Sequence, residues 1–184
     1  PSAFARVEST YAVSEPGFVV LTTPDKANAV FGMAVAVELR DDDPDYPALH
    51  MANYLLGGGG SSRLVNRIRQ QEGLSYSVRS ALSVGALDRA GAWSVSGICA
   101  PENAEKALAC AREELARFLA QGVTPAELAD ARKGYRQSVE VTLASDGAVA
   151  GMLASGLFHG RTLTFAEEQL AKIDALAPAA VTAA

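Results

Sequence analysis

Arg69 and Tyr76, seven positions apart, are the residues of this sequence whose types could act directly on a polar substrate. A guanidinium donates several directional hydrogen bonds, and a neutral phenol donates one. Donors of this kind bind carbonyl oxygens and stabilise the negative charge that develops on them during acyl transfer. Spacing alone favours a structural role for both residues, because functional sites are the minority. Arg69 would then stabilise a helix C-terminus, and Tyr76 would be an aromatic residue at the edge of the core.

A run of glycines lies upstream of this pair: Gly57, Gly58, Gly59 and Gly60. Glycine loses much backbone entropy in a helix and readily takes a positive φ at a helix end, so we expect one helix to stop in this run. Either of the two serines that follow can accept backbone N–H bonds and start the next helix. A further glycine releases the chain into a strand. This order places Arg69 near the end of a helix and Tyr76 nearby, at the start of the strand.

Glycine-rich segments also bind phosphate, because helix N-termini attract anions. No G-K-[S/T] follows the run, however, and no G-x-G-x-x-G follows a strand. A phosphate-binding module is therefore disfavoured, and close approach of the backbone or flexibility is the better interpretation of the run. Arg63 and Arg67, one helical turn apart, are expected to form a solvated face.

Composition excludes several classes of protein. The net charge is −5, and the 16 basic residues are scattered, which argues against a nucleic-acid partner. No apolar run reaches membrane-spanning length, so no membrane segment is expected. Cys99 and Cys110 lack metal-motif spacing and are expected to be buried thiols. Residues 1–184 are expected to form one domain, and the absence of an initiator Met at Pro1 suggests a piece of a longer chain.

The hydrophobic pattern predicts an α+β fold. An apolar, β-rich run at 18–22 and strict alternation at 31–39 predict two strands, and a helix is expected over 46–56. A second helix is expected to bury one face, and two further strands follow, the first with Tyr76 and Val78 on the same side. Long helices are expected to start near Pro101 and at the capping box Thr124–Glu127. This order of paired strands and paired helices fits an antiparallel sheet with helices packed on one face.

Three motifs carry a resemblance to a known family: LGGGGSSRL at 56–64, R-x-x-E-G-L-S-Y from Arg69 to Tyr76, and DDDPDYPAL at 41–49. Together they closely resemble the C-terminal-type domain of the pitrilysin/insulinase family of zinc metallopeptidases, whose relatives include mitochondrial processing peptidase. A weaker likeness continues through APENAEKAL and QGVTPAEL, so the resemblance covers nearly the whole chain. It implies a half-domain with the processing-peptidase fold, which agrees with the α+β prediction.

The family implies a catalytic zinc ion, held by H-x-x-E-H on a helix in members of this inverted-zincin type. This chain contains only His50 and His159, and neither lies in that motif. The resemblance therefore implies that this chain binds no metal and is inactive alone. Zinc is expected in a partner half, either fused upstream or on a separate subunit.

The resemblance also assigns roles to the residues introduced above. In the family, the matching Arg and Tyr reach the active site from the C-terminal half and help bind the substrate backbone, which gives Arg69 and Tyr76 that role. The loop matching the glycine run is a hinge-like connection near the substrate chamber. The implied function is the substrate-binding half of a peptidase that degrades or processes peptides. The alternative is an inactive scaffold of the same fold, as in the mitochondrial respiratory core proteins. Large bacterial relatives often act in the periplasm, which favours that location over the cytoplasm.

Overall fold

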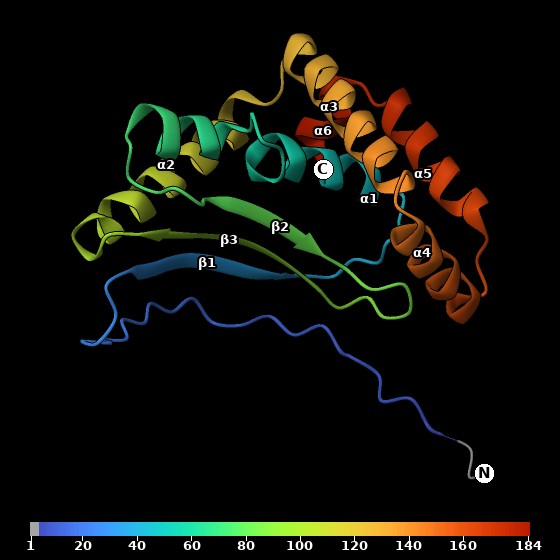
Figure 1. Cartoon of the computed structure of the whole chain (residues 1–184), viewed down its shortest axis with the longest axis horizontal. Coiled ribbons are helices and arrows are strands. Elements are labelled where there is room, and N and C mark those ends of the chain that lie inside the picture. The colour runs from blue at the N-terminus through green and yellow to red at the C-terminus, as the bar shows by residue number, and fades with distance from the viewer. Residues whose placement is uncertain (1–3) are drawn as a thin grey trace.

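A small antiparallel sheet lies at the centre of the computed structural model, which describes residues 4–184. Its strands are β1 (Ala29–Val37), β2 (Arg79–Ser83) and β3 (Gly91–Cys99), in the spatial order β1-β3-β2. The register places Val95 of β3 between Met33 of β1 and Ser80 of β2. The three strands lie side by side in Figure 1, and the helices stand on one side of them.

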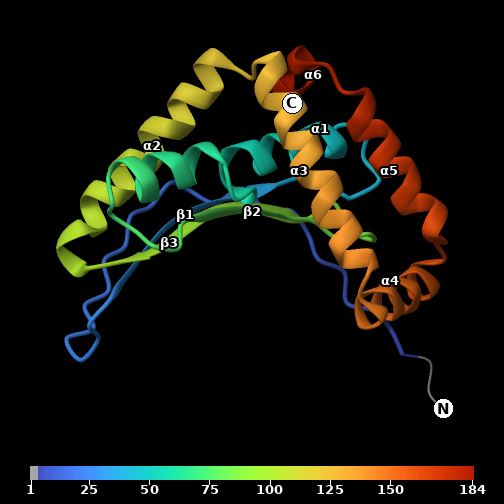
Figure 2. The ribbon, with the colours of Figure 1, turned by 45° about the horizontal axis from the view of Figure 1, so that its top comes forward.

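The described chain contains six α-helices, two π-helical segments and one 3₁₀ segment, and most of them lie on one side of the sheet. Figure 2 shows this layer arching over the curved strands. Their bounds are α1 (Tyr46–Asn53), η1 (Tyr54–Gly58), η2 (Val65–Gln71), η3 (Pro101–Asn103), α2 (Ala104–Gln121), α3 (Pro125–Leu143), α4 (Asp146–His159), α5 (Leu163–Ala175) and α6 (Pro178–Ala183). Helix α2 packs on β1 and β3, whereas α1 and η1 pack on β2. The predicted α+β layer is therefore confirmed.

Alternation along the strands explains why only one face is covered. The side chains of Phe31 and Val95 point into the helix layer and are buried, whereas the opposite face of the sheet is largely exposed and rich in small residues. Met51, Leu64 and Ile68 fill the space between the layers and have no exposed surface. Burial of each such side chain contributes about 1.5–3 kcal/mol, so this layer contact is the main source of stability. Both cysteines are free and buried in the same core.

The strand predicted at 18–22 does not form. Residues 4–22 have no regular secondary structure, and the side chains of Phe18 and Leu21 are largely exposed. The segment runs alongside β1 in Figure 1 without joining the sheet. Its fixed point is Asp88 in the β2–β3 turn, whose carboxylate accepts bonds from the Arg6 guanidinium at 2.6 and 2.8 Å and from the Ser9 amide at 2.9 Å. The apolar, β-rich pattern predicted a strand here, but no other surface of the described chain covers these side chains.

The long helices end and begin as the sequence predicts. Gly122 follows α2 with a φ of 66°, a left-handed conformation that favours glycine. Thr124 then caps α3, because its hydroxyl accepts from the Glu127 amide and the Glu127 carboxylate accepts from the Thr124 amide. Within residues 4–184 no single helix is long and apolar enough to cross a membrane, although α3 and α4, bent by 93° at their junction, meet that test as a pair by length and composition.

The glycine run behaves partly as predicted. The helix ends inside it, and Gly59 is already extended, but none of the four glycines has a positive φ. Gly57 is required for a different reason, because a Cβ atom there would lie 2.6 Å from both the amide nitrogen and the hydroxyl of Ser80 on β2. A Cβ at Gly59 would lie 2.9 Å from the Tyr54 ring. Gly60 has open space around it.

We predict that Gly57→Ala destabilises the fold, because its methyl group would push η1 away from the backbone of β2. Overpacking of this kind costs about 1–3 kcal/mol. Gly60→Ala is the matched control, since the same methyl group meets no atom there and should leave the free energy of unfolding unchanged or slightly raised. Urea denaturation of the two variants tests this, and equal unfolding free energies would contradict it.

Candidate functional site

The segment that carries Arg69 is a wide helical turn packed against the core. Leu64, Val65 and Ile68 are buried as predicted, and Arg69 follows them on the exposed side. The helix is of the π type over 65–71, which the sequence did not reveal. Such wide turns occur mostly as short insertions and are frequent at functional sites.

The two serines after the glycine run do not cap this helix with their hydroxyls, contrary to the prediction. Their backbone carbonyls are used instead: the Asn66 amide donates to Ser62 at 2.9 Å, and the Asn66 side chain donates to Ser61 at 3.0 Å. The Ser62 hydroxyl is buried and has no hydrogen-bond partner among the described residues.

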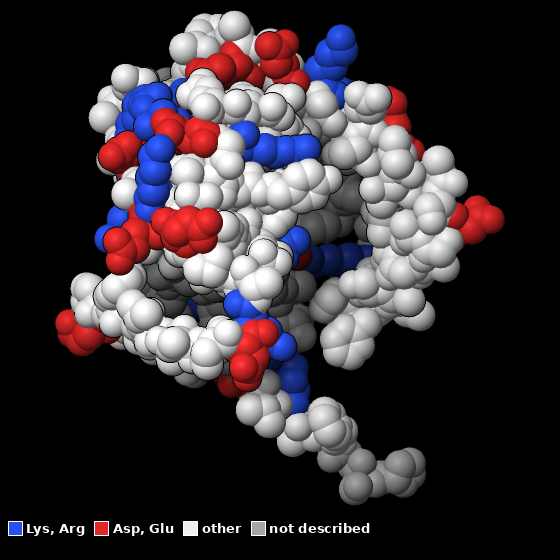
Figure 3. Space-filling view, turned by 60° about the vertical axis from the view of Figure 1, so that its left-hand side comes forward, with Lys and Arg blue, Asp and Glu red and all other residues white. Residues whose placement is uncertain are grey.

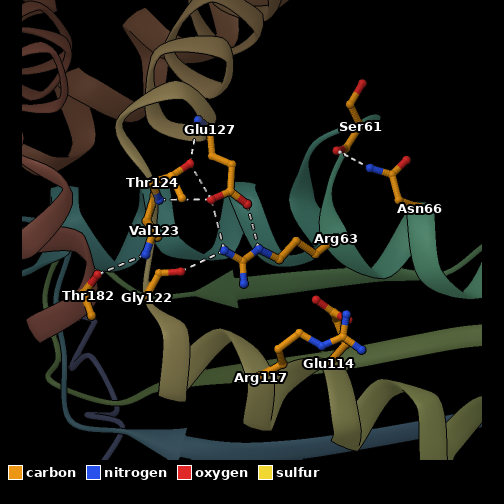
Figure 4. Close-up of polar contacts among 10 residues, drawn as sticks. All are labelled: Ser61, Arg63, Asn66, Glu114, Arg117, Gly122, Val123, Thr124, Glu127 and Thr182. Atoms are coloured by element: carbon orange, nitrogen blue, oxygen red, sulfur yellow. Dashed lines mark hydrogen bonds and ion pairs between the residues drawn. The ribbon is translucent and has the colours of Figure 1, made fainter.

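Arg63 is a structural clamp, and the prediction of a solvated face was wrong for it. Its guanidinium donates to the two carboxylate oxygens of Glu127 at 2.9 and 3.1 Å and to the Gly122 carbonyl at 2.7 Å. It also lies over the Phe118 ring, 4.8 Å from the centroid. Figure 4 shows how these bonds join the start of η2 to the turn between α2 and α3. Arg67 is not freely solvated either, because it pairs with Glu72.

The clamp changes the acidity of its carboxylate. Burial by itself would raise the pKa of Glu127, but the bonds from Arg63 and Thr124 outweigh burial and lower the pKa below its ordinary value of 4.5. The charged form is therefore favoured in the folded chain. Glu127 thus serves both the cap of α3 and the clamp on η2.

Tyr76 is held in place by the residue before it. The Ser75 hydroxyl is buried, donates to the Ile98 carbonyl at 2.7 Å and accepts from the Ser77 amide at 3.3 Å. This local turn interrupts the alternation, so Tyr76 is 81% exposed while Val78 is 5% exposed. The prediction that these two side chains share one side was wrong, and the strand starts at Arg79 instead of Tyr76.

The predicted proximity of Arg69 and Tyr76 is confirmed. The Arg69 guanidinium carbon lies 4.8 Å from the centroid of the Tyr76 ring, a cation–π contact. Tyr76 is not an aromatic residue of the core edge, because its ring stands in solvent apart from this contact. Both residues line an open cavity of about 630 Å³ on the exposed face of the sheet, near the start of β1 and the end of β3. A third exposed residue, Arg79, also lines it and was not singled out by the sequence.

The two histidines do not form a metal centre. His50 lies between the rings of Tyr46 and Tyr135, and burial lowers its pKa. His159 lies on α4 against Phe158. Across residues 4–184, no three His, Cys, Asp or Glu side chains are arranged to hold a metal ion.

Comparison with known proteins gives consistent matches. The family model described as "Peptidase M16 inactive domain" matches residues 2–135. An uncharacterized zinc protease of Streptomyces coelicolor is 31% identical over 155 residues, which are 84% of this chain and 32% of that protein. The non-peptidase homolog YmxG of Helicobacter pylori is 29% identical over 72% of this chain and 30% of its own length. The chain thus spans about a third of these relatives.

A solved structure shows the same architecture. The crystal structure of a peptidase M16 inactive domain from Pseudomonas fluorescens superimposes with a TM-score of 0.71 and 28% sequence identity. The match covers 86% of this chain and 37% of that one.

The clamp gives a prediction for stability. Arg63→Met keeps the aliphatic contact with Phe118 but removes the bonds to Glu127 and Gly122. We expect a loss of about 1–2 kcal/mol near neutral pH, at the low end for bonds to a charged group because Glu127 is partly solvated. Arg112→Met is the control, since Arg112 is exposed and makes no ion pair within residues 4–184.

The same variant has a defined pH dependence. A carboxylate whose pKa is lowered by folding contributes stability above its unfolded pKa and loses that contribution as the pH falls through the folded value. The difference between wild type and Arg63→Met should therefore shrink below the ordinary pKa of 4.5. Urea denaturation over a series of pH values measures this, and a difference that stays constant down to about pH 3 would refute the clamp.

Proposed function

This chain belongs to the peptidase M16 inactive-domain family, and we propose that it is the substrate-binding, non-catalytic half of a zinc metalloendopeptidase. The observation that carries the proposal is the exposed Arg69–Tyr76 pair, which lines an open cavity. An arginine and a tyrosine with a purely structural role would have no need to be exposed to solvent. The partner is a zinc-bearing half, either on the same polypeptide or on another, and peptides are the substrates.

The division of work follows from the donors that this chain offers. Zinc bound in the partner half would polarise the scissile carbonyl and promote attack by water. The described part of this chain has no cluster of side chains that fits the metal, so its contribution is to bind and orient the peptide. The two halves would enclose the peptide between them, with the exposed face of this sheet towards the chamber.

Arg69 and Tyr76 suit that work in different ways. The Tyr76 hydroxyl can donate a hydrogen bond to the substrate carbonyl oxygen as negative charge develops on it. The Arg69 guanidinium already rests on the Tyr76 ring, which restricts its orientation while leaving its N–H groups available to peptide carbonyls. Since Ser75 fixes the backbone beneath Tyr76, little reorganisation is needed when a peptide binds.

The hinge role of the glycine run remains a prediction. Gly57 and Gly59 are buried and closely packed, whereas Gly58 and Gly60 are exposed. Any hinge motion is therefore expected at the exposed positions. The periplasmic location also remains a prediction.

A scaffold with no peptidase activity is the second candidate. It is favoured by the similarity to a non-peptidase homolog of Helicobacter pylori. A scaffold would have no use for an arginine and a tyrosine that stand together in solvent. Loss of the pair would then leave every property of the assembled protein unchanged.

Two substitutions test the proposal in the assembled protein, this chain together with its zinc-bearing half. Tyr76→Phe removes one hydroxyl and should lower kcat for a fluorogenic peptide by about a hundredfold, because the bond forms mainly in the transition state. Arg69→Ala should lower kcat/KM and also raise KM, since it removes donors to the substrate backbone. Arg112→Ala controls for the loss of one positive charge.

Thermal unfolding of each variant should match that of the wild type, because both side chains are exposed. Unchanged turnover in Tyr76→Phe and Arg69→Ala, with the two halves still associated, would reject the role given to this pair. A wild-type assembly that cleaves no peptide would favour the scaffold.

A further inference from the structure

We propose that Arg79 makes this site selective for peptides that carry a carboxylate close to the bond being cleaved. The inference rests on the proposed function, because it assigns a substrate class to the same cavity. Arg79 is the first residue of β2 and lines the cavity together with Arg69 and Tyr76. The carboxylate can belong to an Asp or Glu side chain or to the C-terminus of the peptide.

The first argument is that the arginines of the cavity lack carboxylate partners, whereas most other arginines have one. Eight arginines of residues 4–184 form ion pairs: Arg6, Arg40, Arg63, Arg67, Arg89, Arg117, Arg136 and Arg161. Arg69 and Arg79 form none within the same residues. In a chain with a net charge of −5, acidic side chains are abundant, so two unpaired guanidiniums on one cavity are available for an acidic ligand.

The second argument is the composition of the cavity wall. The nine lining residues include two arginines and no Asp or Glu. Elsewhere the charges are mixed, and over the face seen in Figure 3 basic and acidic side chains lie next to one another in several places. The cavity therefore presents positive charge that the wall itself does not neutralise. A carboxylate is the complement, because arginine binds it through two parallel N–H···O bonds.

The third argument is the arrangement of the wall by strand register. Arg79 lies opposite Ser96, and Val30 lies opposite Ile98, so these side chains share the exposed face. Val30 and Ile98 are 73% and 48% exposed and provide an apolar floor. The arginines stand beside this floor. A side chain with methylene groups and a terminal carboxylate, such as glutamate, matches both parts.

Arg79 is thus a specificity residue and takes no part in bond cleavage. Arg69 has a second task on the substrate backbone, so removing it would affect every peptide. Substitution of Arg79, by contrast, is expected to affect only the preference for a carboxylate. Its side chain is exposed, and its backbone pairing within the sheet does not depend on its charge.

The experiment measures kcat/KM of the assembled peptidase on a matched peptide series. One glutamate is moved through the sequence, and each peptide is compared with its glutamine counterpart. A second comparison sets a free C-terminus against an amidated one. Wild type should prefer the acidic peptide at one position, and Arg79→Gln should reduce that preference by roughly tenfold, as expected for loss of a charge-assisted bond. Turnover of the all-neutral peptide should not change.

Three controls sharpen the result. Arg112→Gln removes the same charge away from the cavity and should leave the preference intact. Arg79→Lys keeps the charge and should retain part of the preference. Raising the salt concentration should weaken the preference in wild type but have little effect in Arg79→Gln. A preference confined to the free C-terminus would support the site and identify the terminal carboxylate as its ligand.

The proposal is overturned if wild type shows no preference for an acidic peptide, or if Arg79→Gln leaves that preference unchanged. It is also overturned if Arg79→Gln slows acidic and neutral peptides equally, because Arg79 would then bind the backbone. Failure of the proposed function has a different signature, since Arg69→Ala and Tyr76→Phe would then leave the turnover of all peptides unchanged.

Discussion

The fold depends on how closely the backbone at Gly57 approaches β2. The amide nitrogen and hydroxyl of Ser80 lie only 2.6 Å from where a Cβ atom of any other residue at position 57 would be, so the helical layer sits directly on the sheet. That contact sets the distance between the helical layer and the sheet. It therefore also sets how far from the sheet η2 begins after the glycine run. The clamp from Arg63 to Glu127 then fixes the direction of η2 against the α2–α3 turn. Because both the distance of η2 from the sheet and its direction are set, the Arg69 guanidinium reaches the Tyr76 ring.

Features with local causes could be predicted from the sequence. The capping box at Thr124 and the end of α2 at Gly122 depend on residues within a few positions of each other. Features decided by distant contacts could not. Arg63 finds its partner Glu127 64 positions away, and the carbonyl of Ile98 holds Ser75 in a turn that reverses the side taken by Tyr76. No periodicity within one segment carries that information.

The failed strand at 18–22 has the same origin. An apolar, β-rich run predicts a strand only if another surface is available to cover it, and in the described chain this run lies beside β1 with its side chains in solvent. The predicted sheet was therefore one strand too large. The missing role of Arg79 is a related case, since a single arginine on a strand has no distinctive pattern until the register places it on the cavity.

The two buried cysteines give the core a built-in chemical reporter. Cys99 ends β3 and Cys110 lies on the buried side of α2, so they occupy the facing surfaces of sheet and helix. Only a thiolate reacts quickly with alkylating or disulfide reagents, and burial raises the pKa of Cys99. Modification therefore requires these surfaces to separate first. The rate at which such reagents consume the thiols would then measure how often the helical layer lifts from the sheet, a transient opening that equilibrium denaturation does not detect.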